Sequence, residues 1–428
     1  MNAEIIAVGT ELLLGDILNT NAQYLARQLA GLGFTVWHQS VVGDNPQRLA
    51  QLAQQARQRS QLVIYSGGLG PTADDLTKET IAAAYGDTLR FDEEQYKRIA
   101  DYFTASGRSV PANNRKQAMV PVHGRTLQND NGTAPGVVFE QDSRMAILLP
   151  GPPKELVPMF EKQVRPLLET LQDGVLYSRI LRVYGIGESR LEELVGHLLE
   201  GSNPTAALYA KTAEVTVRVT AKGDTLEQAK TLCGQLADEF YRLLGDAVYD
   251  EGEEGMEKTV VQLYSRKGMQ LATAESCTGG LVSQRITSVP GSSDMFQCGV
   301  CSYANQVKAR LLAVRQPTLD RFGAVSLQVA GQMALGVRAL ARADVGVGIT
   351  GIAGPGGGSE EKPVGLVYIG AASKEGVWVY KMLLPGRSRD TVRWAASQKA
   401  LDMARRLAAG LPLADCVHCS DAQLDREV

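Results

Sequence analysis

The alternation of strands and helices in the first third of the chain most limits what this protein can fold into. Residues 61–68 (QLVIYSGG) form a near-continuous apolar run, which is typical of a parallel strand covered on both faces. Strand-like and helix-like segments alternate around it, at 4–10, 20–33, 34–42, 45–59 and 144–150. Because strands that alternate with helices form parallel sheets, we predict a doubly wound α/β domain. Asn45 is expected to cap one helix, and another helix is expected from about Thr72.

Two changes in sequence pattern divide the rest of the chain. Residues 175–250 combine strand-like alternation with two amphipathic helices, which predicts a small α+β domain. The acidic segment 251–258 is typical of a linker. Further strands and helices are expected at 256–267, 269–275, 298–304, 345–351, 364–373 and 389–409. We therefore predict two doubly wound α/β domains joined by a small α+β domain, with boundaries at 1–168, 169–252 and 253–428.

Charge and histidine content exclude several classes of protein. Lys and Arg number 44 against 47 Asp and Glu, so there is no basic surplus, and we expect no direct contact with nucleic acid. Glu4 and Glu11 interrupt the apolar residues at the start of the chain, so we expect no signal peptide, no membrane span and a cytoplasmic location. The four histidines do not pair at ligand spacing, which argues against a histidine triad or a multi-histidine metal site.

The six cysteines include two Cys-x-x-Cys pairs. Cys298 and Cys301 lie in a predicted strand, where residues three apart face opposite sides and do not readily chelate one ion. Cys416 and Cys419 lie in a polar C-terminal tail. A structural zinc is the alternative, but we favour small buried side chains for such cysteines and a loose tail for the second pair.

The segment 274–280 (AESCTGG) concentrates reactive groups where a strand ends and a helix begins. Free backbone N–H groups in such a turn can hold an oxyanion or a phosphate. We expect these groups at Ser276, Thr278, Gly279 and Gly280. Ser276 or Cys277 is the candidate nucleophile, and the alternative is that Ser276 only caps the helix.

A second segment, YANQVK, follows the next strand and supplies a candidate base. Asn305 is expected to cap a helix and to place Lys308 one turn inside it. With no histidine nearby in the sequence, a serine nucleophile needs another base, and a desolvated lysine is the known substitute. Tyr303 would relay or donate a proton.

A glycine-rich loop follows a third strand of the same domain. Five of the eight residues 351–358 are glycine, so the backbone can approach a ligand closely. Lys362 and Arg387 lie further on, and either would neutralise a phosphate. The three segments each follow a predicted strand and together are the candidate site of this domain.

AESCTGG, YxNxxK, ITGIAGPGGGSEEKPVG and PGxR together resemble the nicotinamide-nucleotide amidohydrolase family, the C-terminal domain of CinA proteins, over about residues 256–412. This resemblance implies hydrolysis of the carboxamide of nicotinamide mononucleotide to nicotinate mononucleotide and ammonia, without a metal or other cofactor. It also implies that Ser276 attacks the carboxamide, with Lys308 as base and Tyr303 assisting. The substrate-binding residues that it implies are Glu275, Thr278, Gly279, Gly280, Asn305, Thr350, Gly351, Gly354 and Arg387.

The first domain carries its own glycine-rich turn. Residues 66–72 (SGGLGPT) lie between a strand and a helix and suit phosphate oxygens. Asp74 and Asp75 come directly after it, and two carboxylates beside such a turn suggest a divalent cation bridging to a pyrophosphate. The alternative is that both only favour the helix N-terminus electrostatically. The nucleotide-binding residues expected here are Thr10, Glu11, Asn21, Ser66, Gly67, Gly68, Gly70, Thr72, Asn131 and Gly151.

GTELLLGDxxNTN, SGGLGPTxDD, NGTAPG and LPGPPKE resemble the MoaB-like, molybdopterin-binding domain as it occurs in CinA proteins. This resemblance implies hydrolysis of ADP-ribose to AMP and ribose 5-phosphate with a divalent metal, Mg, Co or Mn. It spans nearly the whole chain, including a small KH-like middle domain, and implies a homodimer. Nicotinamide mononucleotide and ADP-ribose are therefore the expected small-molecule partners, both of them fragments of NAD.

Two alternatives from other classes remain open. The first domain would bind molybdopterin or a nucleotide without turnover, as a binding protein in cofactor assembly. The whole chain would act as an adaptor in DNA uptake or repair, but the near-neutral charge argues against this. Residues 185–188 (GIGE) also differ from the Gly-x-x-Gly clamp of RNA-binding KH domains, so we expect the middle domain to be a spacer or an interface.

Overall fold

The structure is a computed structural model that describes residues 1–105, 107–171 and 174–426. Its contacts divide the chain into two compact units, residues 1–178 with 221–232 and residues 179–220 with 233–428. Within the described ranges, no helix is long and apolar enough to cross a bilayer. The predicted fold class, two α/β domains joined by a small α+β domain, is confirmed.

The first sheet has six strands in the order β2-β1-β3-β8-β7-β6. Its strands are β1 (Asn2–Val8), β2 (Thr35–Val42), β3 (Leu62–Ser66), β6 (Arg125–Leu127), β7 (Gly136–Gln141) and β8 (Arg144–Leu149). The pairs β1–β2, β1–β3 and β3–β8 are parallel, whereas β7 is antiparallel to both neighbours. A separate two-stranded sheet pairs β4 (Leu89–Phe91) with β5 (Met119–Pro121).

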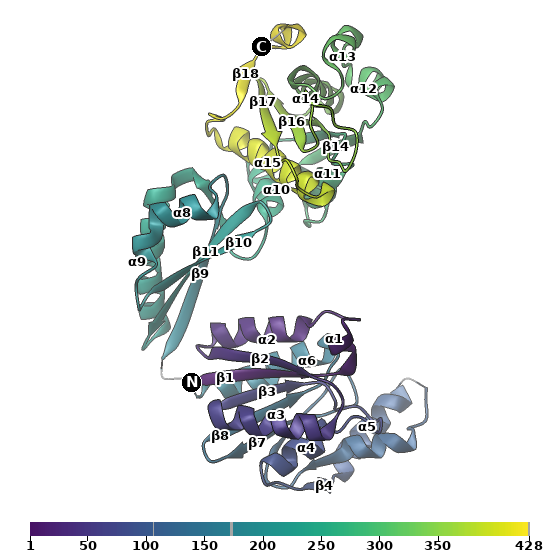
Figure 1. The fold of residues 1–428 in the computed structure, drawn as a ribbon, viewed down its shortest axis with the longest axis vertical. Helices are drawn as coiled ribbons and strands as arrows, with labels where there is room; N and C mark the ends of the chain where they lie inside the picture. Colours follow the sequence, from purple (N-terminus) through teal and green to yellow (C-terminus); the bar gives the residue numbers. More distant parts are fainter. Residues whose placement is uncertain (106, 172–173, 427–428) are drawn as a thin grey trace. The chain divides into compact units, whose positions relative to one another are not determined.

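Helices cover both faces of this first sheet (Figure 1). The helices of this part of the chain are α1 (Thr10–Leu14), α2 (Thr20–Gly31), α3 (Pro46–Arg59), α4 (Thr77–Ala84), α5 (Glu93–Ala105), η1 (Ala112–Ala118), α6 (Pro153–Met159), η2 (Phe160–Val164) and α7 (Arg165–Glu169). Those whose residues pack in the two clusters on the sheet are α2, α3, α4, α6, η2 and α7. All five residues of β3 are buried, as its apolar run predicts. Ile64 packs in the cluster with α2 and α6, and Tyr65 packs in the cluster with α3 and α4.

Two local predictions for these helices have different outcomes. The Asn45 side chain accepts from Arg48 N at the start of α3, so the predicted cap is confirmed. The helix expected from about Thr72 begins only at Thr77. The Asp75 carboxylate instead accepts from Thr72 N at 2.9 Å, and such a local side-chain bond holds these residues in a turn.

The small sheet has the order β10-β11-β9-β12. Its elements are β9 (Val175–Val183), α8 (Glu188–Val195), η3 (Gly196–Leu198), β10 (Thr205–Lys211), β11 (Glu214–Gly223), α9 (Leu226–Leu244), η4 (Gly245–Ala247) and β12 (Val248–Glu251). Strands β10 and β11 form an antiparallel hairpin, and its tip is Thr212 and Ala213. We call this the β10–β11 hairpin below.

The third sheet is mixed, with the order β14-β13-β15-β16-β17-β18. Its strands are β13 (Leu271–Glu275), β14 (Phe296–Cys301), β15 (Val345–Gly351), β16 (Leu366–Ser373), β17 (Gly376–Leu383) and β18 (Val417–Cys419). Strand β13 runs parallel to β14 and β15, and the remaining pairs are antiparallel. The carboxyl ends of β13, β14 and β15 therefore share one edge of the sheet.

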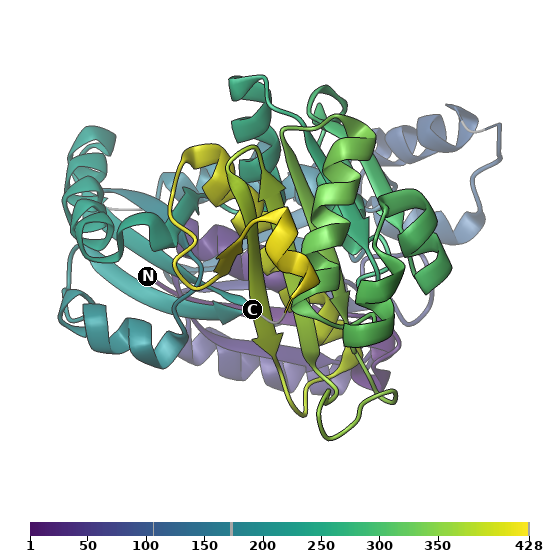
Figure 2. The same cartoon turned by 90° about the horizontal axis from the view of Figure 1, so that it is seen from above.

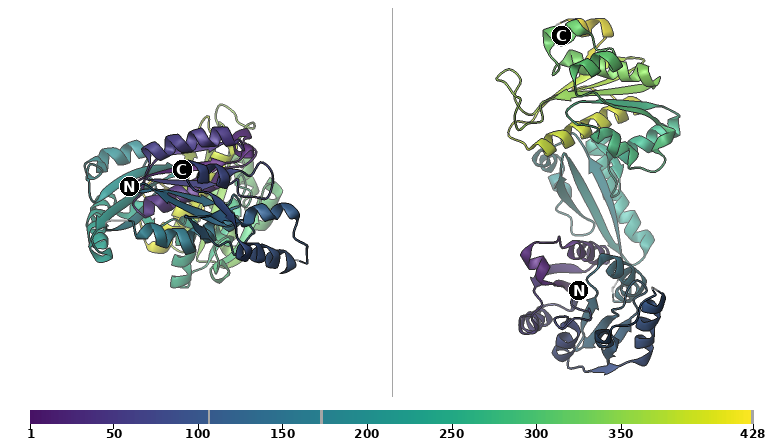
Figure 3. Two further views of the ribbon diagram at one scale, coloured as in Figure 1. Left: turned by 90° about the horizontal axis from the view of Figure 1, so that it is seen from below. Right: turned by 90° about the vertical axis from the view of Figure 1, so that its right-hand side faces the viewer.

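Helices also cover both faces of the third sheet. They are α10 (Met256–Lys267), α11 (Leu281–Thr287), η5 (Ser292–Asp294), α12 (Asn305–Leu312), α13 (Gln316–Phe322), α14 (Leu327–Ala341), α15 (Arg389–Ala409) and η6 (Asp421–Asp425). Figure 3 shows α15 (yellow) along one face, where its apolar residues pack in the cluster that contains β15. On the other face α14 (green) packs against η6 (yellow), as Figure 2 shows.

The expectation of a loose C-terminal tail is wrong. Strand β18 pairs with β17, and His418 stacks on Trp378 with ring centroids 4.6 Å apart. Cys419 and Leu424 are buried. Removing their apolar side chains from water stabilises the packed arrangement of the C-terminal segment. Cys298 and Cys301 lie in β14 as predicted. Within the described ranges, no three His, Cys, Asp or Glu side chains gather as metal ligands.

Candidate active sites

The candidate site of the third domain forms where three neighbouring parallel strands end. Ser276 N donates to Ile349 O at 3.0 Å, and Ser302 N donates to Glu275 O at 2.9 Å. The turn 276–280 therefore lies between the end of β15 and the segment that comes after β14. Polar groups at the carboxyl ends of adjacent strands converge in the usual ligand position of α/β sheets.

Lys308 reaches this turn from the first turn of α12. Its Nζ lies 3.2 Å from Ser276 Oγ, 2.6 Å from Ser302 O and 3.0 Å from Tyr303 O. Asn305 does not cap the helix, contrary to prediction: Ala304 has the extended backbone of the N-cap position, and α12 begins at Asn305 itself. Lys308 still lies one turn inside the helix, as the spacing predicts.

The surroundings of Lys308 favour its neutral form. The side chain is 1% exposed, and burial lowers the pKa of the amine because the charged form loses its hydration. All three hydrogen-bond partners of Nζ are uncharged. The structure gives Nζ as the donor to all three oxygens. When the amine has lost a proton, its two remaining N–H groups can donate to the carbonyls and its lone pair can accept from Ser276 Oγ.

The two candidate nucleophiles differ in their contact with Lys308, whose Nζ hydrogen-bonds to Ser276 Oγ. The Cys277 thiol is buried, and burial raises its pKa to about 11, so it stays protonated at neutral pH. Ser276 does not cap a helix either, because α11 begins at Leu281 and its N-cap residue is Gly280. The alternative that Ser276 only caps the helix is therefore wrong, and Ser276 stays the candidate nucleophile with a hydrogen bond to Lys308.

Glu275 is completely buried and holds the start of α11. One carboxylate oxygen accepts from Ser283 N at 2.9 Å and Ser283 Oγ at 2.8 Å, and the other accepts from Val282 N at 3.1 Å. Between this cap and the strand, Gly279 and Gly280 take left-handed φ angles of 61° and 92°. Only glycine adopts these angles without strain, so the turn depends on both glycines.

The expectation of free N–H groups in the turn is wrong at two positions. Ser276 N donates to Ile349 O, and Gly279 N donates to Ser276 O at 3.0 Å. These bonds close the turn locally and anchor it to β15. Thr278 is buried, and its hydroxyl lacks a hydrogen-bond partner among the described residues. An unpaired buried hydroxyl is costly unless a ligand or water satisfies it.

The other expected residues of this site differ in how they face it. Tyr303 gives its carbonyl to Lys308, but its side chain is 67% exposed. Thr350 is buried, and its hydroxyl donates to Ala324 O at 2.7 Å. Gly351 ends β15, and Gly354 takes a left-handed φ of 84°. Arg387 is exposed.

Two arginines that the sequence motifs did not single out bind the loops of the site. Arg389 Nη1 donates to Gly354 O at 2.7 Å, and Arg393 Nη2 donates to Thr278 O at 2.8 Å. They lie one turn apart at the start of α15, which places both on one face. This spacing of four is the only signal that the sequence offers for them. Lys362 is held elsewhere, since its Nζ donates to Phe322 O at 2.6 Å.

The candidate site of the first domain is a cavity of about 420 Å³. The expected residues that line it are Glu11, Gly67, Gly68, Gly70, Thr72, Asp74, Asp75 and Gly151. Asn21 and Ser66 line an adjoining cavity of about 310 Å³ that shares Glu11 and Gly151. A side chain at Gly67 would collide with Val8 O, which explains the glycine.

Asp74 and Asp75, which both line this cavity, differ in their exposure and hydrogen bonding. Asp75 Oδ2 accepts from Thr72 N and from the Thr72 hydroxyl, so part of that carboxylate is used within the turn. Asp74 is exposed. Mg²⁺ commonly binds through one or two carboxylates, with substrate phosphates and water completing its shell. Glu11, Asp44 and Glu155 also line the cavity, but within the described residues no three such side chains gather as metal ligands, so a cation here would be held by one or two carboxylates.

Two expected residues lie outside both cavities of the first domain. The Thr10 amide and hydroxyl both donate to Asp44 Oδ2 at 2.9 Å. Asn131 is exposed, whereas Thr133 and Ala134 from the same loop line the larger cavity. Asp44 lines it as well and was missed. Its position just after β2, at the carboxyl edge of the sheet, is the signal that could have found it.

Three family models match the chain in order. They are "Probable molybdopterin binding domain" over residues 4–170, "Damage-inducible protein CinA KH domain" over 178–249 and "CinA C-terminal domain" over 253–408.

Relatives of similar length also match. The "Putative competence-damage inducible protein" of Caldanaerobacter subterraneus subsp. tengcongensis is 47% identical over 410 residues, which cover 96% of this chain and 99% of the relative. The "CinA-like protein" of Dictyoglomus thermophilum is 48% identical over 407 residues, 95% of this chain and 99% of that one. The solved structure of "competence/damage inducible protein CihA from Agrobacterium tumefaciens" is 42% identical, with a TM-score of 0.34, and covers 35% of this chain and 90% of its own.

Proposed function

This chain belongs to the CinA family, and from that membership and the site geometry we propose that its third domain hydrolyses the carboxamide of nicotinamide mononucleotide. The observation that carries the proposal is the distance of 3.2 Å between Ser276 Oγ and Lys308 Nζ, together with the burial of that lysine. A serine beside a desolvated lysine is an activated nucleophile for acyl transfer. The products are nicotinate mononucleotide and ammonia.

The chemistry follows from the neutral amine of Lys308. As Ser276 Oγ bonds to the carboxamide carbon, Lys308 takes the hydroxyl proton. When the C–N bond breaks, Lys308 returns this proton to the leaving nitrogen, which departs as ammonia. Water, losing a proton to Lys308, then attacks the ester carbon, and that proton returns to Ser276 as the ester breaks. The sum is amide plus water to acid plus ammonia.

The binding groups follow from the same geometry. We assign the phosphate of the substrate to the turn at Thr278, Gly279 and Gly280, with Arg393 beside it on α15. The unpaired Thr278 hydroxyl is a polar group that a ligand or water would satisfy. Gly351, Gly354 and Thr350 would shape the pocket for the ring and ribose. Glu275 acts through the turn, because both of its oxygens are used at the start of α11.

Ammonia release from nicotinamide mononucleotide by the purified full-length protein tests this assignment. Wild type is expected to release ammonia with and without a chelator, since no step requires a metal. Ser276→Ala should abolish release, and Cys277→Ala is the matched neighbouring control that should retain it. Turnover by Ser276→Ala at the wild-type rate would remove Ser276 as the nucleophile.

A trapping experiment separates the acyl-serine ester from a directed water. Hydroxylamine competes with water for an ester, so the proposed route gives a hydroxamate of the nucleotide in wild type. A hydroxamate yield of zero at undiminished ammonia release would favour a water activated directly by Lys308.

For the first domain we propose hydrolysis of ADP-ribose to AMP and ribose 5-phosphate. The supporting observation is the cavity of about 420 Å³ lined both by the glycine turn and by Asp74 and Asp75. The backbone N–H groups of Gly68 and Gly70 would bind the phosphates, whereas that of Gly67 donates to Leu149 O at 3.0 Å. A divalent cation, Mg²⁺, Mn²⁺ or Co²⁺, would neutralise pyrophosphate charge when held by the two aspartates.

The test of this second activity is AMP formation with and without a chelator. Loss of AMP formation on chelation, restored by one of the three cations, supports the hydrolase. Tight binding of molybdopterin with no turnover of ADP-ribose would instead support a binding protein. Light scattering on the full chain tests the expected homodimer in the same preparation.

A further inference from the structure

We propose that Trp394 and Arg285 are positioning residues for the third-domain site, through which the β10–β11 hairpin of the KH-like domain holds the turn of Ser276. The proposal rests on the amidohydrolase function above and adds residues and a role for the middle domain. All the residues involved belong to the second compact unit.

Trp394 connects the hairpin to α15. Its indole Nε1 donates to Thr212 O, at the hairpin tip, at 3.1 Å. The guanidinium carbon of Arg285 lies 4.3 Å from the centroid of the indole ring. A cavity of about 500 Å³ adjoins this contact and is lined by Lys211, Thr212, Trp394 and Gln398, among others. Because a cavity adjoins the contact, few groups connect the β10–β11 hairpin to α15, and the hydrogen bond from Trp394 to Thr212 O is one of them.

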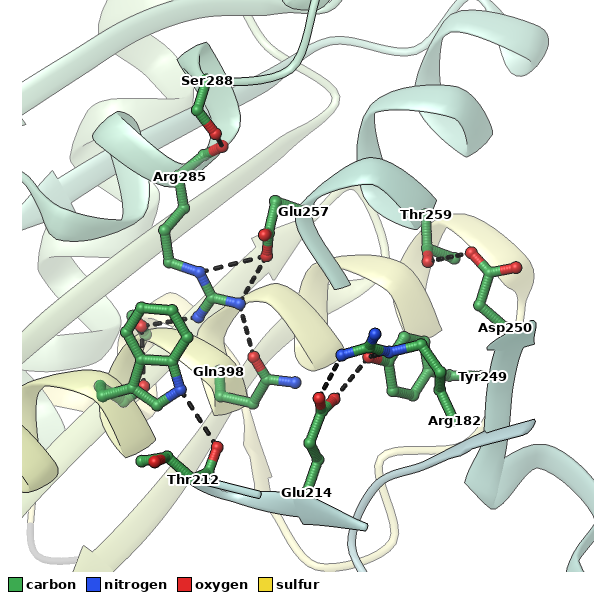
Figure 4. A network of polar contacts seen from close by, with 12 residues as sticks. Arg182, Thr212, Glu214, Tyr249, Asp250, Glu257, Thr259, Arg285, Ser288 and Gln398 are labelled. Carbon is green, nitrogen blue, oxygen red and sulfur yellow. Dashed lines mark hydrogen bonds and ion pairs between the residues drawn. The ribbon is translucent and has the colours of Figure 1, made fainter. Parts of the chain in front are cut away.

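Arg285 joins its own helix, α11, to α10 and α15. Its side chain is 4% exposed, and its nitrogens donate to Glu257 on α10 and to Ser397 and Gln398 on α15. Figure 4 shows the guanidinium between Glu257 and Gln398. A buried guanidinium with this many bonds resists movement, because shifting it would leave charges and donors unpaired.

The hairpin is held next to its tip, because Glu214 is the first residue of β11 after Thr212 and Ala213. Arg182 on β9 donates to Tyr249 OH at 2.6 Å and to Glu253 O at 2.8 Å, and it forms an ion pair with Glu214 on β11. Figure 4 shows this second group beside that of Arg285. The side chains of Arg182 and Glu214 are 5% and 7% exposed. The hairpin tip is thus a rigid partner for Trp394.

The two helices tied by Arg285 and Trp394 are those that hold the reactive turn. Helix α11 starts directly after Gly280, and its first N–H groups bind Glu275. Helix α15 carries Arg393, which precedes Trp394 in the chain. The guanidinium of Arg393 donates to Thr278 O. A displacement of either helix therefore moves the turn relative to Lys308, which is carried by α12. Small misplacement of reacting groups is costly in rate.

Steady-state kinetics of Trp394→Phe provide the first test. Phenylalanine keeps an aromatic ring over Arg285 but cannot donate to Thr212 O. We expect kcat for ammonia release to fall about tenfold, with KM little changed, because coupling along such a network amounts to a factor of this order. Trp378→Phe is the matched control, since Trp378 lies in β17 and stacks on His418 of β18. Its kcat should equal that of wild type.

A second test leaves Trp394 in place. The chain has three tryptophans, so Trp37→Phe with Trp378→Phe makes Trp394 the only tryptophan that emits. In a Ser276→Ala background, binding of nicotinamide mononucleotide should shift the Trp394 emission, with equilibrium dialysis showing that the ligand is bound.

The outcomes separate the two proposals. Equal kcat in Trp394→Phe and wild type, or bound ligand without an emission shift, overturns the positioning role alone. A wild type that releases no ammonia overturns the amidohydrolase and the positioning role with it. If kcat falls in Trp394→Phe but not in Trp378→Phe, and the emission shift is seen, the inference is supported. If Trp394→Phe also loses thermal stability, the emission measurement decides.

Discussion

The two candidate sites lie in similar α/β layers but are prepared for chemistry to different degrees. In the third domain, a buried lysine with uncharged partners lies against Ser276 before any ligand arrives. In the first domain, an exposed Asp74 and a partly used Asp75 line an open cavity. Burial already favours reactivity in the first arrangement, whereas the second, under the proposed function, would need a cation and the phosphates of its ligand to complete it.

This difference teaches how one fold type supports unlike reactions. Both sites use a glycine turn after a buried parallel strand. The side chains that meet each turn decide the chemistry: a neighbouring helix delivers Lys308 in one case, and two aspartates come directly after the turn in the other. The fold alone therefore does not assign function, and the side chains around each turn do.

The largest expected effect comes from removing the buried base. Lys308→Met keeps the apolar stem but has no lone pair for Ser276, so ammonia release should fall about 10³-fold. AMP formation from ADP-ribose, measured on the same preparation, should be unchanged, because it depends on the first domain. A parallel loss of both activities would indicate global damage or a shared site and would break the comparison.

The second-largest expected effect is the change of kcat/KM for ammonia release with pH. Lys308 acts as a base only when deprotonated, so kcat/KM should rise with pH and level off above the pKa of the amine. Burial lowers that pKa, so the plateau begins below the range of an ordinary lysine. A profile that still rises steeply through the ordinary lysine range would contradict a desolvated base. AMP formation, which does not use Lys308, supplies the reference profile.

Neutralising Asp74 or Asp75 should give a smaller loss of activity, limited to AMP formation by the first domain. Asp74→Asn and Asp75→Asn each remove one charge from the cation site, and we expect AMP formation to fall by about 10–100-fold, the range seen when metal sites are weakened. Raising the cation concentration should restore part of the rate. Unchanged AMP formation in both variants would favour the purely electrostatic role at the start of the helix, and ammonia release is the internal control.

The smallest expected effect sharpens the role of Glu275. Glu275→Gln keeps an acceptor but turns the other oxygen into a donor that faces an N–H group of α11, so the variant should lose about 1–3 kcal/mol of unfolding free energy. Denaturant unfolding measures this loss. If Glu275 binds substrate directly instead, KM should rise strongly while stability stays near that of wild type.

Several features of the fold could be predicted from the sequence because they depend on local pattern. The helices expected at 256–267 and 389–409 match α10 and α15, and the apolar run at 61–68 contains β3. The structure of the C-terminal tail could not be predicted, since most of its residues are polar and its few apolar residues form no recognisable pattern. Leu424 packs on α14, and only the packed partner reveals why that segment is ordered.

The sequence by itself determined the strand-turn-helix segments and their reactive residue types, because hydrophobic period and glycine positions act locally. The tertiary structure placed three of these segments at one edge of the third sheet. The tertiary structure decided which side chains meet. It brought Lys308 to Ser276 across 32 residues, turned the Glu275 carboxylate onto α11, and set Arg389 and Arg393, not Arg387, against the loops. Those contacts depend on the rotation of each helix against the sheet, which packing fixes and periodicity leaves open.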